Sequence, residues 1–327
     1  MVCPKSRILA VAILLAALTL GCASTQQYAQ VAQAGSAYAT AMQELLGATG
    51  DIWVESDSVF LLKQKSLLHQ QIFIEEILPP TPKDDPKCEK EPTREKAFAC
   101  YLKKEYAKFR QNDQDNLATI AQLQAHVRLL GEYFDLLQKL ATGGYPEKTQ
   151  KSVQGLLKGI SDLGNVLRQN PLLASDQIEL AGSFANLAVE FAIRGMLRKA
   201  LEENGVIRRE LATQEKLLAR VSHQLKVDLG RTREWQETRL LKQPYLAVGP
   251  GVPDPDGWVK NRRLLIGMGE TVEQVDKAAG AAKQLRQAYE DLVGGKVSPS
   301  TLNNLLADLE KFIALAEAVK RAAGGTK

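Results

Sequence analysis

Histidine and cysteine are scarce in this chain of 327 residues, which has three of the first and four of the second. His69, His126 and His223 stand far apart, and none belongs to a His-Glu-x-x-His zinc motif or has glutamate three residues before it. Those spacings put two metal ligands on one face of a helix, so the common zinc and di-iron patterns are missing. We expect the histidines to be surface or boundary residues, and we predict no metal and no other cofactor.

Motifs for nucleotide binding and nucleophilic catalysis are missing as well. The sequence has no Gly-x-Gly-x-x-Gly, no phosphate-binding loop ending in Gly-Lys-Ser/Thr, and no Gly-x-Ser-x-Gly elbow. Acidic pairs such as Glu75-Glu76 and Glu202-Glu203 are more typical of solvated helix faces than of acid–base sites. A site assembled from distant residues stays open, but no catalytic residue can be named, and the prediction is that the protein is not an enzyme.

Charge of one sign is not in excess, because the chain has 42 basic and 38 acidic residues. Nucleic-acid binding needs a clustered basic face, which this balance does not indicate, so no nucleic-acid partner is expected. The hydrophobic content of 45% is enough for a substantial core and excludes a chain that is disordered throughout.

The first 22 residues have the pattern of an export signal. Lys5 and Arg7 precede an apolar run over residues 8–20, which is too short to cross a bilayer with ease but suits a signal-peptide core. The run ends in Thr19-Leu20-Gly21-Cys22, which resembles the lipobox of bacterial lipoproteins, with threonine where that family usually has leucine.

This resemblance implies that residues 1–21 are a cleaved signal peptide and that Cys22 is lipidated, with palmitate among its acyl chains, so that the protein is held at a bilayer. Two of the basic residues leave with the leader, which gives a mature chain of 40 basic and 38 acidic residues. Ala23, rather than aspartate, implies the periplasmic face of the outer membrane of a Gram-negative cell. The alternatives are an ordinary signal peptide cleaved near Ala23 and a retained membrane helix.

Of the remaining cysteines, Cys3 lies in the leader, and Cys88 and Cys100 are predicted to form a disulfide in an oxidising periplasm. The bridge would close a loop of about a dozen residues and contribute about 3 kcal/mol. Two free thiols are the alternative.

Helical periodicity predicts an all-α fold, an elongated up-and-down bundle of several helices with long, coiled-coil-like members. Two stripes with heptad-like spacing carry this prediction. They consist of Ile120, Leu123, Val127, Leu130, Phe134, Leu137 and Ala141, and of Leu302, Leu305, Leu309, Phe312, Ala316 and Val319.

Proline and glycine divide the mature chain into a first helical half, residues 22–170, with a Pro-rich loop over 79–92, and a second half, residues 171–327, with a Pro/Gly-rich loop over 244–257. Thr93 is expected to cap one helix and Ser298 another. The expected helices cover 24–78, with a possible interruption at 47–50, and then 93–140, 146–169, 175–242 with a break at Asn204-Gly205, 258–293 and 298–323.

The two halves match locally. Leu129, Tyr133, Asp135 and Leu136 recur as Leu285, Tyr289, Asp291 and Leu292, 156 residues later, and Gly-Gly follows each set. Two tandem helical repeats would explain the match, and a chance likeness between amphipathic helices is the alternative.

Two segments are candidates for contact with other molecules. The second loop presents Tyr245, Leu246, Val248 and Trp258 on a proline-stiffened backbone, which suits partner contact, although a plain connector would look similar. Residues 178–197 are apolar on nearly all sides and are expected to form a buried core helix, with membrane insertion or partner docking as the alternative.

These features together predict a lipid-anchored protein of the cell envelope whose bundle is a structural or protein-interaction module. Its expected partners are the bilayer, through Cys22, and an envelope protein of unknown identity. The alternatives are an accessory subunit of a secretion or transport assembly, a membrane-active protein resembling bundle-type pore formers, and an enzyme.

Overall fold

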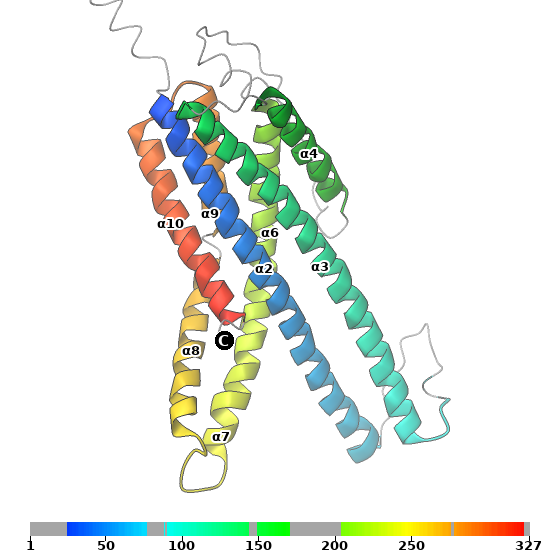
Figure 1. Ribbon diagram of the computed structural model, residues 1–327. Helices are drawn as coiled ribbons and strands as arrows, with labels where there is room; N and C mark the ends of the chain where they lie inside the picture. Colours follow the sequence, from blue (N-terminus) through cyan, green and yellow to red (C-terminus); the bar gives the residue numbers. More distant parts are fainter. Residues whose placement is uncertain are drawn as a thin grey trace, which may run out of the picture. The chain divides into compact units, whose positions relative to one another are not determined.

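A computed structural model describes residues 25–76, 88, 90–143, 149–170, 204–275 and 278–323, and all regular structure in these residues is helical (Figure 1). This confirms the predicted all-α, multi-helix bundle. The elements are α2 (Thr25–His69), the π-helical η1 (Gln70–Ile74), α3 (Arg94–Ala141), α4 (Thr149–Gln169), α6 (Asn204–Gln236), the π-helical η2 (Glu237–Lys242), α7 (Gln243–Leu246), α8 (Pro255–Gln274), α9 (Ala278–Val293) and α10 (Pro299–Ala322).

The described residues form two compact units. Unit 1 takes its residues from Met1–Glu44, Leu123–Arg220 and Lys277–Ala316, and unit 2 from Leu45–Gln122, Val221–Asp276 and Glu317–Lys327. Each unit therefore combines pieces from before and after residue 170. The division of the chain into halves at that residue stays a prediction about the sequence.

Three helix ends follow their sequence signals. The backbone N–H of Lys96 donates to Thr93 Oγ1 at 3.3 Å, so Thr93 caps α3 as expected. The N–H of Thr301 donates to Ser298 Oγ at 3.1 Å at the start of α10. Gly295 ends α9 with φ of 67°, and the backbone bonds around it are those of a Schellman motif.

Helix α2 runs without a break through residues 47–50, where the sequence suggested an interruption. The cause is packing against α3, because a Cβ at Gly50 would lie only 3.1 Å from Leu117 Cδ2. Thr49 is buried beside it and donates its hydroxyl to the carbonyl of Leu45 at 2.7 Å. Small residues thus let two helices approach closely, and this contact outweighs the low helix propensity of glycine, about 1 kcal/mol relative to alanine.

The loop expected over residues 244–257 is shorter in the structure, because helical turns take up both of its ends. Pro255 lies in the first turn of α8, where a missing N–H forfeits no helical bond. Pro244 lies in α7, which continues directly from the π-helical η2, so helical backbone runs through this proline. Asp254 caps α8 by accepting a hydrogen bond from the N–H of Gly257 at 2.9 Å.

Two further expectations involve residues outside the described set. Of the helix predicted over 258–293, the structure describes α8 and α9, and residues 276–277 between them are not described. The residues before Asn204 are not described either, so the break predicted at Asn204-Gly205 stays a prediction. The predicted core helix over 178–197 and the loop over 79–87 lie outside the described residues.

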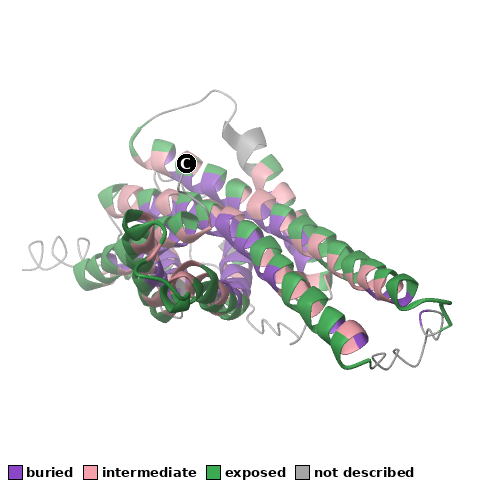
Figure 2. Ribbon diagram, turned by 90° about the horizontal axis from the view of Figure 1, so that it is seen from below, coloured by how far each residue is buried: buried purple, intermediate pink, exposed green. Residues whose placement is uncertain are grey.

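Both heptad-like stripes form core. Every member is buried except Ala141, which is half-buried. Leu140, which falls off the first stripe, is buried too, so the apolar face is wider than that of a two-stranded coiled coil, as a bundle requires. Figure 2 shows the result along the helices, with buried residues on one side and exposed residues on the other.

The core of unit 1 is built around aromatic rings that glycine allows to come close to α2. A Cβ placed on Gly35 would lie 2.4 Å from the ring of Phe134. The neighbouring Tyr133 is fully buried, and its hydroxyl lies 2.9 Å from that of Tyr289, which is buried as well. These two tyrosines are the residues that match 156 positions apart, so equivalent positions of the suggested repeats meet as they would near a two-fold axis. The duplication itself stays a prediction.

Gly35→Ala is expected to lower the free energy of unfolding by about 1–3 kcal/mol, because the added methyl group must displace the Phe134 ring. Gly155→Ala in α4 is the matched control. Nothing lies within 4 Å of a Cβ there, so helix propensity alone predicts a gain of about 0.5–1 kcal/mol. Urea unfolding followed by circular dichroism measures both, and a gain in both variants would contradict the close contact.

Candidate functional site

The four loop residues predicted to contact a partner come together in unit 2. Tyr245 and Trp258 stack with ring centroids 6.0 Å apart and an angle of 27° between their planes. Tyr245, Leu246 and Val248 are exposed, whereas Trp258 is half-buried. We call these four residues the apolar tip.

Within the apolar tip, Trp258 has an anchoring position. Its indole N–H donates to the carbonyl of Leu241 at 3.1 Å, and the guanidinium of Arg262 lies 5.6 Å from its ring centroid. The cap at Asp254 starts α8 just before this residue and so directs the indole back toward η2. Trp258 therefore holds the base of the loop, while the other three residues are left in solvent.

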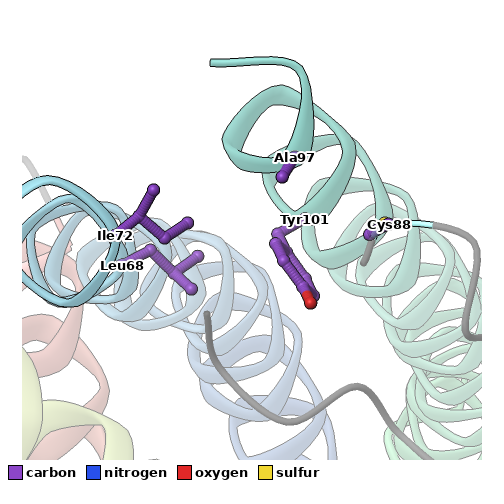
Figure 3. Close-up of a cluster of buried hydrophobic side chains, with 5 residues drawn as sticks. All are labelled: Leu68, Ile72, Cys88, Ala97 and Tyr101. Carbon is purple, nitrogen blue, oxygen red and sulfur yellow. The ribbon is translucent and has the colours of Figure 1, made fainter. Parts of the chain in front are cut away.

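The predicted disulfide pair also lies in unit 2. The sulfur atoms of Cys88 and Cys100 lie 1.98 Å apart, at disulfide distance, across twelve positions of sequence. Figure 3 shows Cys88 beside α3, together with a buried cluster in which Leu68 and Ile72 face Tyr101. The bridge thus ties the segment before α3 to an apolar cluster shared by the ends of two long helices.

The most buried charges of unit 1 were not expected from the sequence. Glu210 on α6 is fully buried and accepts three hydrogen bonds from arginine. Arg168 on α4 donates Nη1 to both carboxylate oxygens, at 3.0 and 2.9 Å, and Arg209 donates Nε at 2.8 Å. Gly164 leaves the necessary room, because a Cβ there would lie 2.0 Å from a Glu210 oxygen.

His126 on α3 joins this network and is fully buried, which corrects the expectation of a surface or boundary position. Its Nδ1 lies 2.7 Å from the amide nitrogen of Gln214, and its Nε2 lies 3.4 Å from Glu210 Oε2. An amide nitrogen can only donate, so Nδ1 accepts and Nε2 carries the proton that faces the carboxylate. His69 and His223 are exposed, as predicted.

The ionisation of Glu210 follows from these contacts. Burial raises the pKa of its carboxyl, but the hydrogen bonds from His126, Arg168 and Arg209 lower it by more, so the pKa lies below the ordinary 4.5. The carboxylate is therefore charged at neutral pH and engaged by donors from three helices. This arrangement fixes the positions of α3, α4 and α6, and no atom of Glu210 is exposed to a substrate.

Unit 2 has smaller polar contacts between its long helices. Ser56 on α2 donates its hydroxyl to the buried Asp228 on α6 at 3.0 Å, and burial raises the pKa of Asp228. Partial burial and the neighbouring carboxyl of Asp57 raise the pKa of Asp113 to about 6. The contact between Ser56 and Asp228 joins α2 to α6.

Among the described residues, no group of three or more His, Cys, Asp and Glu side chains is placed to hold a metal ion. The search for membrane spans in the same part of the chain finds no helix long and apolar enough to cross a bilayer. Comparison with family models, with curated proteins and with solved structures finds no match to this chain. The proposed lipidation site, Cys22, lies outside the described residues.

Glu210→Gln is expected to lower the free energy of unfolding by about 3 kcal/mol, because it leaves Arg168 and Arg209 beside a neutral group. Glu132→Gln is the control, since its ion pair with Arg128 is largely exposed and worth less than about 1 kcal/mol. Urea unfolding at neutral pH measures both. Equal losses in the two variants would show that the buried ion pairs of Glu210 contribute no more to stability than the exposed pair of Glu132 does.

Cys100→Ser is expected to cost about 3 kcal/mol of stability, the value for a closed loop of roughly this length. A reductant should lower the wild-type protein to the stability of the variant and leave the variant unchanged. If dithiothreitol shifts neither unfolding curve, the two cysteines are not bridged in solution.

Proposed function

We propose that the chain is a lipid-anchored lipoprotein of the cell envelope, acylated at Cys22, whose helical bundle is a structural or protein-interaction module. The observation that carries this proposal is the leader, in which two cationic residues and an uncharged apolar run end directly before Gly21-Cys22. Residues 1–21 are then removed, and the acylated cysteine becomes the first residue. Ala23 favours the periplasmic face of the outer membrane of a Gram-negative cell.

The physical basis of such an anchor is hydrocarbon burial. Each buried methylene contributes about 0.8 kcal/mol, so a single acyl chain binds reversibly whereas two or three hold a protein almost permanently. The acyl chains proposed at Cys22 would in this way hold the bundle at the bilayer.

The described residues support a structural or interaction role for the bundle. The Glu210 network places its ionised groups between helices, with the carboxylate fully buried and bonded to two arginines. Large apolar side chains are exposed on several helical segments, among them Leu62 and Ile74, as well as at the apolar tip. A protein whose charged groups fix its scaffold and whose apolar groups protrude is suited to contact, and we assign it an envelope protein as a partner.

Labelled palmitate should enter the wild-type protein in a Gram-negative host and should not enter Cys22→Ser, because the thioether that carries the diacylglycerol requires that sulfur. Cys3→Ser is the matched control. It removes a leader cysteine and should leave labelling unchanged. Gel fluorography of the purified chains measures incorporation.

Mass spectrometry of the amino terminus distinguishes the remaining possibilities. An acylated Cys22 supports the proposal, a free terminus near Ala23 indicates an ordinary signal peptide, and an intact leader indicates a retained helix. Label in Cys22→Ser at the wild-type level would overturn the proposal.

A further inference from the structure

The apolar tip exposes several bulky apolar side chains within a short segment. Tyr245, Leu246 and Val248 are 68%, 74% and 107% exposed. No residue of η2 or α7 is fully buried, although Leu240 and Leu241 are half-buried. Three large apolar side chains within four positions, all in solvent, form a protruding patch that a connector does not need.

The other π-helical end of unit 2 provides an internal comparison. Segment η1 also continues a long helix, but its Ile72 is fully buried and packs in the cluster with Leu68 and Tyr101. Ile74 of the same segment is 70% exposed, so η1 buries one bulky apolar residue and exposes another. The apolar tip differs in exposing three such residues within four positions, none of them buried.

Exposed cations flank the apolar tip on both sides. Arg239 and Lys242 lie on η2, and Lys260, Arg262 and Arg263 lie on α8. Arg239 stands 5.0 Å from the ring centroid of Trp235, and Arg262 stands over Trp258 in the same way. These contacts with the tryptophan rings keep both guanidinium groups at the surface, next to the apolar side chains of the tip.

The acidic residues of the same region are already engaged. Asp254 accepts the capping hydrogen bond of α8, and Asp256 lies in the first turn of that helix, where the positive end of the helix dipole offsets its charge. Glu237 pairs with Lys242 at 3.2 Å, so this cation is engaged as well. Between residues 237 and 263 the five cations outnumber the three carboxylates, so the region has a net positive charge of two.

We propose that the apolar tip inserts into the interfacial layer of an anionic lipid bilayer, with the flanking cations at the headgroup phosphates. Two interactions hold proteins at such surfaces: apolar side chains are buried at the boundary of the acyl chains, and basic side chains are attracted to the anionic headgroups. The exposed patch is long enough to enter this interfacial layer but too short to cross the bilayer. A protein pocket would take the large indole as its anchor, but Trp258 is turned inward and its N–H is occupied by Leu241.

This inference goes beyond the proposed function and does not depend on Cys22. The test uses the chain from Ala23, made without a leader or lipid, which retains every residue that the structure describes. It should co-float with vesicles of phosphatidylcholine and phosphatidylglycerol, bind much less to vesicles of phosphatidylcholine alone, and dissociate as salt is raised.

The double variant Leu246→Ser/Val248→Ser should lower the vesicle partition coefficient about tenfold or more, because both side chains lose their transfer into the interface. The matched control is Leu62→Ser/Ile266→Ser, which removes two apolar side chains that are also exposed, though less so, to 54% and 55%, from the surfaces of α2 and α8. This control should bind as the wild type does. Lys260→Gln/Arg263→Gln should weaken binding and flatten its salt dependence.

Three results would overturn the inference: no co-flotation with the anionic vesicles, equal binding to neutral vesicles, or equal losses in the tip variant and in the control. Photo-crosslinking from position 245 to a protein, in the absence of vesicle binding, would assign the apolar tip to a protein partner instead. Palmitate labelling at Cys22 is read separately, so either proposal can fail while the other stands.

Discussion

The buried carboxylate of Glu210 is the constraint on which the organisation of unit 1 depends. A charge removed from water needs partners close by. Here they are Arg168 on α4, His126 on α3, and Arg209, the neighbour of Glu210 on α6. Apolar contacts alone tolerate sliding by a turn, whereas a carboxylate with three committed donors does not. The network therefore fixes the register of α3, α4 and α6 relative to one another, which their apolar faces alone would leave open.

The sequence predicted the class of fold and most helix ends because those depend on local signals. The heptad-like stripes, the caps at Thr93 and Ser298, and the turn at Gly295 all express preferences that extend over a few residues. The continuous course of α2 through residues 47–50 could not be seen in this way, since it depends on contact with Leu117 on another helix. Pro255 was expected in the loop because proline in the first turn of a helix and proline in a loop look the same in sequence. Pro244 was expected in the loop as well, but the helical backbone of η2 continues through it into α7.

The residues of the candidate sites could likewise be predicted where their sequence signal is local, and could not where they come from distant helices. Cys88 and Cys100 could be paired because only four cysteines are present and two are accounted for at the amino terminus. The residues of the apolar tip could be named because they cluster in one short segment. His126, Glu210 and Arg168 lie on three helices at unrelated spacings, so no local pattern joins them. The one available signal, a lone histidine near the apolar stripe of α3, more often marks a boundary position than a buried one.

Because of the contact between Tyr133 and Tyr289, the effect of a substitution at either position depends on the residue at the other, although the two are far apart in the sequence. Phenylalanine at 133 would leave the buried hydroxyl of Tyr289 without that partner, at a cost of about 1–3 kcal/mol, whereas removing both hydroxyls should cost less than the two single losses added together. The order of substitution therefore matters, because loss at 133 first passes through a less stable protein. Among descendants of this chain, the two sites should be inherited as a pair, tyrosine with tyrosine or phenylalanine with phenylalanine, and mixed combinations should be short-lived.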